Sequence, residues 1–354
     1  IYVPRLNDEL KMSKIYKLNG AEQEQLDELV AGDIGAVAKM DELETSDTIC
    51  DPDLDIELEG IDFPEPMLTL AAYPADGVDE EKMSNALHRY SLEDTTFKVN
   101  YNKETKELLL TGMGNIHISM IRDICKRKFD VDFNTKDPKV AYKETLQKKV
   151  NAEEKYKKQS GGRGQYGNVL LRIEPLPRGK GFEFEEEIFG GAIPSGYIPA
   201  VEKGIREAKE EGVLAEYPVV DFKVTVYDGS YHDVDSSEMA FKIASSKAFR
   251  KGLKRAKPVL LEPIMDVKVV VPERFMGDIM GDLNSRRGKI SGMEPDGDIQ
   301  IINAQVPQGE MFSYVSDLKS ITGGYGYFTM DFSHYEKVPH EVQEDVIEEA
   351  KEDE

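Results

Sequence analysis

The stretch MLTLAAYPADGVDEEKMSNALHRY, residues 67–90, decides how this chain folds. It opens with an apolar strand and, after the turn PADG, continues with apolar residues at helical spacing over 79–90. The residues that follow complete the order βαββαβ, with strands near 96–101 and 107–111, a helix over 115–128 and the closing strand FDVDF. This order predicts two amphipathic helices packed on one face of an antiparallel sheet.

The same order of elements returns nearer the carboxyl end. Its elements are the strand IMDVKVVV, a helix over 273–283, strands near 288–293 and 298–306, a helix over about 310–320 and the strand YFTMDF. The chain is therefore expected to contain two compact α+β sandwiches of one topology. Residues 1–62 differ, because short pieces such as AGDIGAV (31–37) and DTIC (47–50) alternate apolar and polar residues, which predicts the later part of a β-barrel.

A third kind of segment lies between the two sandwiches. It contains an extended piece, VAYKETLQKKV, a glycine-rich loop, the strand NVLLRIEPL, a helix over about 198–211, the strand VVDFKVTVYDG and the helix AFKIASSKAFRKGLKRA, which Pro258 ends. We predict an α+β domain here. The predicted fold class is thus α+β and multidomain. Its segments are 1–62, 63–139, 140–258, 259–338 and an acidic tail at 339–354, expected to be a solvated helix or a frayed end.

The composition is that of a folded protein with several domains. The 354 residues are 40% hydrophobic and carry 45 Lys and Arg against 68 Asp and Glu, a net charge of −23. The cysteines, Cys50 and Cys125, form no CxxC pair, so neither a disulfide framework nor a thiolate zinc site is supported and a cytoplasmic location is expected. No apolar run is long enough to span a membrane, and a start at Ile1 suggests a fragment whose upstream part is missing.

The charge is distributed unevenly along the chain. Residues 142–258 hold 21 Lys and Arg against 18 Asp and Glu, a net charge of +3, which leaves −26 for the rest. Basic residues gather there over 148–163 and again over 247–257. Such clusters attract phosphate backbones, although each could also be a solvated helix face balanced by glutamates. Two clusters in one segment favour RNA as the partner.

The first loop of this segment is SGGRGQYG, residues 160–167. Its glycines lack Cβ, so the backbone can approach a ligand closely while Arg163, Gln165 and Tyr166 project. Arg can pair with phosphate, Gln can read a base edge and Tyr can stack on a base. A purely structural hairpin is the alternative.

The second loop, HDVDSSE (232–238), offers one histidine and three acids within seven residues. A metal site or a His/Asp acid-base pair would use such groups, but no HExxH or EF-hand spacing is present. The acids are better explained as charges at a helix N-terminus, with Asp235 and Ser236 or Ser237 at the cap and Glu238 in the first turn. We therefore expect no metal here and interpret His232 as an exposed loop-tip residue.

A basic run near the carboxyl end, GDLNSRRGKISGM, places Arg286, Arg287 and Lys289 where a helix leads into a strand. Cations there complement the helix dipole and could equally bind RNA phosphates. Nucleotide hydrolysis requires a phosphate-binding loop, and GxxxxGK[ST] occurs nowhere in the sequence. We expect no GTPase site and no catalytic residue in this chain.

At KQSGGRGQYG and DGSYHDVDSSEMAFKIA the sequence resembles the elongation factor G family of bacterial translational GTPases. The similarity continues through GDIGAV, FPEP, LTGMGNIH, EPIMDV, GDLNSRRGKISGM, EMFSYVSDLKS and HYEKVP and covers the chain to about residue 339. It implies the end of a β-barrel second domain, a ferredoxin-like third, an elongated fourth and a ferredoxin-like fifth. It also implies that the GTPase domain, with its GTP and Mg²⁺, precedes Ile1 and that this chain holds no cofactor.

The resemblance further implies partners and contact residues. The fourth domain is expected to enter the decoding site, and the fifth to dock on the large subunit near the sarcin-ricin loop and stalk base. The residues implied to contact tRNA and mRNA are Ser160, Gly161, Gly162, Arg163, Gly164, Gln165, Tyr166, His232 and Asp233. Arg286, Arg287 and Lys289 are the candidates for docking on rRNA. The expected protein is a monomer that promotes translocation on the ribosome and contacts both subunits but no membrane.

Four positions depart from the usual pattern of the family: Thr95, Asn115, Asn168 and Tyr325. Asn115 replaces an acid of the usual GMGELHL. These departures leave open a paralogue with altered GTPase coupling, or one specialised in ribosome recycling. An autonomous RNA-binding scaffold and a metal-dependent hydrolase using HDVDSSE are the alternatives from other functional classes.

Overall fold

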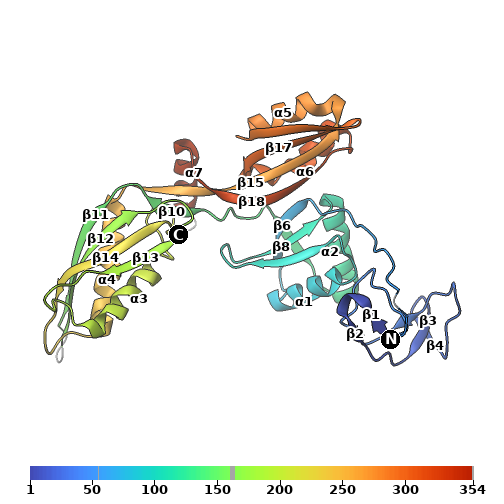
Figure 1. Cartoon of the computed structure of the whole chain (residues 1–354), viewed down its shortest axis with the longest axis horizontal. Helices are drawn as coiled ribbons and strands as arrows, with labels where there is room; N and C mark the ends of the chain where they lie inside the picture. Colours follow the sequence, from blue (N-terminus) through green and yellow to red (C-terminus); the bar gives the residue numbers. More distant parts are fainter. Residues whose placement is uncertain (55, 160–163, 353–354) are drawn as a thin grey trace.

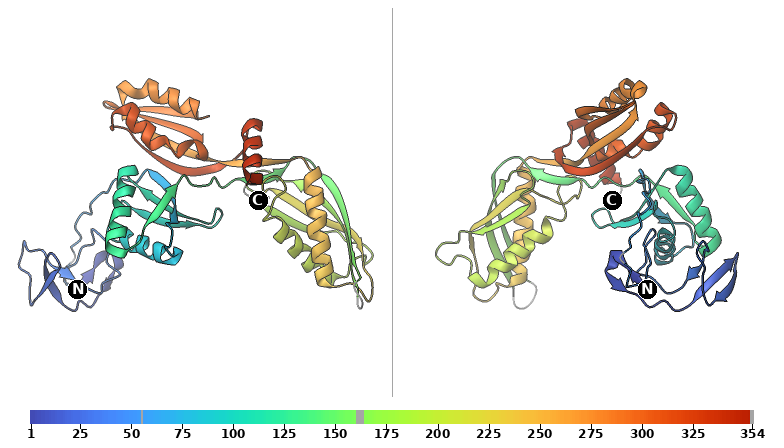
Figure 2. Two further views of the ribbon diagram at one scale, coloured as in Figure 1. Left: turned by 180° about the vertical axis from the view of Figure 1, so that it is seen from behind. Right: turned by 45° about the vertical axis from the view of Figure 1, so that its right-hand side comes forward.

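The computed structural model describes residues 1–54, 56–159 and 164–352 and shows an elongated molecule (Figure 1). Two α+β modules lie next to one another, small sheets at the amino end lie beside the first, and a further α+β domain extends to the other side (Figures 1 and 2). The α+β, multidomain class predicted from the sequence is confirmed. No helix in these ranges is both long and apolar enough to cross a lipid bilayer.

Residues 1–62 form two small open sheets. β1 (Tyr2–Val3) pairs with β2 (Asp8–Glu9), and β3 (Ile15–Asn19) lies between β4 (Glu22–Leu26) and β5 (Ala36–Val37). Neither sheet closes into a barrel within 1–54 and 56–62. The expected strand AGDIGAV supplies only β5, because Gly32 turns the chain with a φ of +94°, and DTIC supplies only a bridge from Cys50 to Tyr2.

The first α+β module has the predicted βαββαβ order. Its elements are β6 (Leu68–Pro74), α1 (Glu80–Ser91), β7 (Lys98–Asn102), β8 (Glu107–Gly112), α2 (Asn115–Phe129) and β9 (Phe133–Lys136). The antiparallel sheet has the order β9-β6-β8-β7, which is ferredoxin-like. α1 begins close to where the sequence indicates, because the Asp79 carboxylate accepts hydrogen bonds from the amides of Glu81 and Lys82.

The second module repeats this topology. Its elements are β15 (Pro258–Pro272), α5 (Met276–Ser285), β16 (Lys289–Asp296), β17 (Ile299–Pro307), α6 (Tyr314–Thr322) and β18 (Tyr327–Lys337). The strand order β18-β15-β17-β16 corresponds to that of the first module. A short 3₁₀ turn precedes each helix, so the predicted helices over 273–283 and 310–320 are each a turn followed by a helix.

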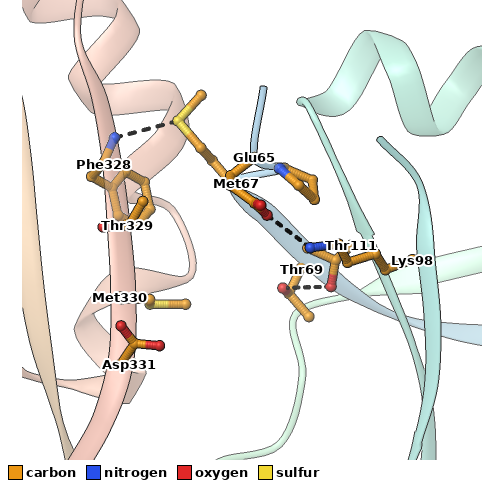
Figure 3. Close-up of a pocket in the computed structure, with 10 residues that line it drawn as sticks. Glu65, Met67, Thr69, Lys98, Thr111, Phe328, Thr329, Met330 and Asp331 are labelled. Atoms are coloured by element: carbon orange, nitrogen blue, oxygen red, sulfur yellow. Dashed lines mark hydrogen bonds and ion pairs between the residues drawn. The ribbon is translucent and has the colours of Figure 1, made fainter. Parts of the chain in front are cut away.

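The two modules share one hydrophobic core. Met67, next to β6, accepts a hydrogen bond on its sulfur from the amide of Phe328 in β18 at 3.5 Å, and both residues line a pocket between the modules (Figure 3). Asn115, one of the positions that depart from the family pattern, donates its side-chain amide to the hydroxyl of Ser316 at 3.2 Å. The modules therefore act as one support for the domain that extends from them.

The extended domain is a four-stranded sheet with two helices. Its elements are β11 (Val150–Lys158), β12 (Gln165–Pro175), β13 (Phe182–Glu186), α3 (Ile198–Ala208), β14 (Phe222–Ser230) and α4 (Glu238–Arg255). The strand order is β11-β12-β14-β13, with only β13 and β14 parallel within this sheet. α3 packs closely on α4 because Gly204 faces the carbonyl of Lys242, where no Cβ would fit.

β15 joins the extended domain to the second module. Its first residues pair with β10 (Lys143–Leu146), next to the extended domain, and its later residues pair with β17 and β18 of the module. In Figure 1 this strand forms the bridge between the two parts. The position of the extended domain is thus set by a continuous hydrogen-bonded strand rather than by a flexible linker.

The carboxyl-terminal segment forms a helix with one packed face. It forms α7 (His340–Glu352), and Val346 packs in a small core with Ala215 and Leu260. The side-chain oxygen of Gln343 accepts a hydrogen bond from the amide of Leu260 at 3.0 Å. The segment is thus a helix, one of the two forms expected, but it is not solvated on every side, because an apolar stripe at helical spacing packs on the start of β15.

A buried carboxylate fixes the base of the extended domain. Glu144 in β10 is buried and accepts hydrogen bonds from the amides of Val213, Leu214 and Ala215 at 2.7 to 3.0 Å. Gly212 lies so close to this carboxyl group that a Cβ would not fit. The loop between α3 and β14 is thereby held on β10.

Replacing Glu144 by Gln should destabilise the extended domain, because one carboxamide N–H would face a backbone N–H that has lost its acceptor. We expect a loss of about 1–3 kcal/mol, measured as a lower midpoint of urea unfolding. Glu186→Gln in β13, at an exposed position, is the matched control and should leave the midpoint unchanged. An E144Q midpoint equal to that of the wild type would contradict the holding role of Glu144.

Candidate RNA-contacting tip of the extended domain

The described end of the glycine-rich loop and the acid-containing loop lie at one end of the extended domain. β12 begins at Gln165, β14 ends at Ser230, and the two strands are antiparallel neighbours, so Gly164 and the loop after β14 lie at the end of the sheet away from β15 (Figure 1). Of the predicted contact residues, Ser160, Gly161, Gly162 and Arg163 lie outside the described residues. The others are placed at this end, which we call the tip: Gly164, Gln165, Tyr166, His232 and Asp233.

Hydrogen bonds join the two loops into one unit. The amide of Tyr166 donates to the carbonyl of Asp235 at 2.8 Å, and the amide of Gly164 donates to the Asp235 carboxylate at 3.0 Å. In return, the hydroxyl of Ser236 donates to the carbonyl of Tyr166 at 3.0 Å. Because residues about seventy positions apart are bonded, the described end of the first loop, 164–166, is held on the second loop.

The glycines of the first loop serve this close contact. A Cβ on Gly164 would lie 3.0 Å from the carboxyl group of Asp235, and a Cβ on Gly167 would lie 3.1 Å from the backbone of Ala240. Neither glycine has a positive φ, so the requirement is for space and not for an unusual backbone conformation. Close packing of Gly164 on Asp235 and of β12 on α4 thus explains part of the glycine content that the sequence presented as a ligand-approach signal.

The second loop leads into α4 as the sequence indicated. Ser237 is the N-cap, with its hydroxyl accepting from the amide of Ala240 at 3.2 Å, and Glu238 lies in the first turn. Asp235 does not cap α4. Its carboxylate instead accepts a hydrogen bond from the amide of Gly164 in the first loop. No sequence spacing revealed this contact, since its partner lies far away in the chain.

His232 is held from one side by its own loop. Its Nδ1 atom accepts hydrogen bonds from the amides of Val234 and Asp235, both at 3.2 Å, and its backbone amide donates to the hydroxyl of Ser236 at 2.9 Å. The imidazole lies 6.3 Å from the ring of Tyr166 between centroids, and its side chain is 55% exposed. The ring is therefore held through Nδ1, while more than half of the side chain is exposed.

Tyr166 is also fixed. Its hydroxyl shares a hydrogen bond of 2.8 Å with Ser230, and the ammonium of Lys155 lies 5.3 Å from its ring centroid. Asp233 is exposed and Gln165 is partly exposed. The tip thus presents an amide and an imidazole, with the ammonium of Lys155 in β11 over the ring of Tyr166.

The metal-site alternative receives no geometric support from the described ranges, where no group of three or more His, Cys, Asp and Glu side chains is arranged to hold a metal ion. Within the second loop, the Nδ1 atom of His232 and the nearer carboxylate oxygen of Asp235 are 3.8 Å apart. Hydrogen bonds between and within the loops account for the conformation of both side chains.

A further aromatic residue near the tip was not found from the sequence. Phe189 is 94% exposed, while its neighbour Ile188 packs against the domain core. Gly190 and Gly191, both with positive φ, turn the chain, and Ile193 is buried beside Gly229 at the end of β14. The sequence does contain a signal for this exposed residue, an aromatic side chain directly before two glycines.

The three basic residues predicted to dock on rRNA have unequal environments. Arg286 is only 12% exposed and pairs with Asp282 at 2.9 Å and with Asp317 at 2.5 Å. Arg287 is 29% exposed and pairs with Glu310 and bidentately with the buried Glu262.

The hydrogen bond to Glu262 raises the pKa of the Arg287 guanidinium above its usual range. Lys289 pairs with Glu336 and is 67% exposed. The geometry gives both arginines a structural role within the second module and leaves Lys289 as the most accessible cation of the three.

Comparisons with known proteins cover most of the chain. Family models of elongation factor G match in order: domain III at residues 63–137, domain IV at 138–257 and the C-terminus at 259–346. Among solved structures, a crystal structure of a protein from Thermus thermophilus is similar with a TM-score of 0.81 and 40% sequence identity. The match covers 96% of this chain and 51% of that one, so this chain spans about half the length of that protein.

Asp235→Ala should release Gly164 from the second loop, because Gly164 loses its acceptor while the backbone bond of Tyr166 to residue 235 remains. We expect faster hydrogen-deuterium exchange at the amide of Gly164, a smaller change at Tyr166 and little change in global stability. Asp233→Ala, in the same loop at an exposed position, is the matched control and should exchange as the wild type does. Unchanged protection in D235A would refute the coupling.

Arg287→Ala should destabilise the second module, because the buried carboxylate of Glu262 is left without its partner. The expected loss is about 3 kcal/mol, the lower end for breaking a buried pair, since Arg287 is partly exposed. Lys289→Ala should cost less than about 1 kcal/mol, as for other surface pairs. Thermal unfolding measures both, and equal melting temperatures for the two variants would contradict the structural role of Arg287.

Proposed function

This chain belongs to the elongation factor G family, and we propose from this membership that it is the ribosome-binding part of a translation elongation factor. In this proposal it promotes GTP-dependent translocation of tRNA and mRNA. A GTPase domain that precedes Ile1 binds GTP and Mg²⁺ and supplies hydrolysis, and the chain itself contributes binding and shape. The partners are both ribosomal subunits, tRNA and mRNA, and the protein acts as a cytoplasmic monomer.

The observation that carries the proposal is the tip, where two loops are hydrogen-bonded together at the far end of an extended domain. Gln165 and His232 are presented there on a backbone whose conformation is already fixed. A fixed contact surface loses little conformational entropy when it binds, which favours entry into a structured RNA site. We propose that the tip contacts tRNA and mRNA in the decoding site.

Electrostatics support the same orientation. The segment 142–258 has a net charge of +3, whereas the rest of the chain carries −26. An RNA-lined cleft repels the acidic part and admits the near-neutral domain. In this proposal the second module docks on the large subunit near the sarcin-ricin loop and stalk base, with Lys289 as its most accessible cation.

A recycling paralogue is the second candidate, and Asn115 is the observation that favours it. A neutral amide stands where the family pattern usually has an acid, and it bonds to Ser316 across the junction of the two modules. A change of charge at this junction would alter the coupling between the GTPase domain and the tip without altering the tip itself.

Gln165→Ala and His232→Ala in the full-length protein should each slow single-turnover translocation about 3- to 10-fold, the effect of one lost hydrogen bond. Folding should be retained, because neither side chain is buried. Lys180→Ala, an exposed position at the opposite end of the extended domain, is the control and should translocate at the wild-type rate. Wild-type rates in both tip variants would contradict the role of the tip.

A subunit-splitting assay with ribosome recycling factor separates the remaining possibilities. Fast translocation by the full-length protein supports the translocase. Splitting without translocation supports the recycling paralogue. Ribosome-independent RNA binding, with no effect of GTP in either assay, would instead support an autonomous scaffold and overturn the proposal.

A further inference from the structure

The two basic runs of the sequence meet on one side of the extended domain. β11 carries the exposed Lys155, Lys157 and Lys158 of the first run, and α4 carries the second run. α4 packs on β11, where a Cβ on Gly252 would lie 3.0 Å from the Cβ of Ala152. Residues far apart in the sequence thus form one basic surface, on the side of the domain and not at its tip.

Four cations of this surface follow one border of α4 and form what we call the basic ridge: Lys247, Lys251, Lys254 and Arg255. Residues three, four, seven and eight positions apart lie on the same side of an α-helix, so the four side chains point toward the same flank of the domain. At 1.5 Å for each residue, the row is about 12 Å long.

Two cations of the ridge also cover the edge of the sheet. β11 is an edge strand, next to β12 alone in its sheet. The ammonium of Lys251 donates to the carbonyl of Glu153 at 3.1 Å, and the guanidinium of Arg255 donates to the carbonyl of Asn151 at 3.3 Å. Lysine commonly protects such an edge. A carbonyl is neutral, however, so these bonds leave the positive charges of the ridge uncompensated.

Acidic side chains offset little of this charge. Among the described residues, the ridge has one ion-pair partner, Glu154, whose carboxylate lies 3.5 Å from the ammonium of Lys251. The ammonium of Lys247 lies 5.2 Å from the ring centroid of Tyr156, and Lys254 is exposed. The ridge is therefore a strongly positive strip on a chain whose net charge is −23.

We propose that the basic ridge binds the phosphate backbone of a double-stranded RNA helix. This inference rests on the proposed ribosomal function and adds to it a second RNA surface, separate from the tip. Contacts at the side and at the end of one rigid domain would fix its orientation, which neither contact could do alone.

The choice of a duplex follows from the chemistry of the ridge. Surfaces that bind single-stranded RNA usually offer exposed aromatic rings on which the bases stack. Tyr156, the aromatic residue in contact with the ridge, is partly buried in the domain core and lies beneath the ammonium of Lys247. A row of positive charges without a free ring beside it suits the regular phosphates of a helix, whose paired bases are not available for stacking.

Removal of charge tests the ridge in the full-length protein. Lys247→Gln and Lys254→Gln each take away one charge and leave the bonds of Lys251 and Arg255 to β11 in place. Each variant should bind ribosomes roughly 5-fold more weakly at about 0.1 M potassium chloride and should reduce the slope of log affinity against log salt by about one. Lys203→Gln, at an exposed position of α3, is the matched control and should keep the wild-type affinity and slope.

These measurements separate the ridge from the tip. Urea unfolding midpoints should be equal in all three variants, because the substituted side chains are exposed. Combining Lys254→Gln with His232→Ala should give the sum of the two separate effects on ribosome binding, since the sites share no contact. Wild-type affinity and slope in both K247Q and K254Q overturn the ridge and leave the proposed function of the tip intact. Wild-type behaviour of the ridge and tip variants together contradicts the proposed function as well.

Directed cleavage identifies the partner. Lys254→Cys, in a full-length protein whose other exposed cysteines are replaced, carries a tethered iron-EDTA group that generates hydroxyl radicals. On the ribosome it should cut both strands of one rRNA helix, and the same group at Lys203→Cys should not cut that helix. Cuts confined to an unpaired strand overturn the duplex. Binding without any cut in rRNA overturns RNA as the partner and indicates an acidic protein segment in its place.

Discussion

The pairing of β15 is the constraint on which the arrangement of the molecule depends. This strand pairs with β10 at its start and with β17 and β18 beyond it, so one hydrogen-bonded ladder runs from the base of the extended domain into the second module. Tyr335 reinforces the join, because its hydroxyl donates to the carbonyl of Ala141 at 3.0 Å and its ring lies under the ammonium of Lys143. Strand pairing therefore determines the direction in which the extended domain points, and with it the position of the tip.

Local periodicity was enough to predict the two modules and the fold class. In α1, Asp79 and the spacing of Met83, Leu87 and Tyr90 specify the start and the buried face of the helix within one short stretch. The same holds for Ser237 at the start of α4. These features depend on residues three to eight positions apart, which a sequence displays directly. Where a glycine at positive φ interrupts the alternation of apolar and polar residues, as at Gly32, the observed strand is shorter than the predicted one.

Contacts between distant residues could not be predicted in this way. Asp235 read as a helix-cap acid, and only the fold brings Gly164 to its carboxylate. From the sequence Arg287 was a candidate for binding RNA, because its partners, Glu262 and Glu310, are about 25 positions away on other elements and could not be recognised. The apolar residues of α7 can be found in the sequence, but the surface around Leu260 on which they pack cannot. In each case the sequence did not show which residues contact the side chain or helix face, because tertiary packing determines these partners.

The tip shows why such distant contacts matter for the proposed function. A loop that orders only on binding loses part of its interaction energy to conformational entropy, at about 1–2 kcal/mol for each residue fixed. Here the bonds of Asp235, Ser236 and the His232 Nδ1 atom fix the described part of the tip before any partner arrives. The side chains of Gln165 and His232 remain partly or largely exposed beside these bonds. A near-neutral domain with a pre-ordered tip can thus form directed polar contacts in an RNA cleft without relying on a large positive charge, which would bind RNA anywhere.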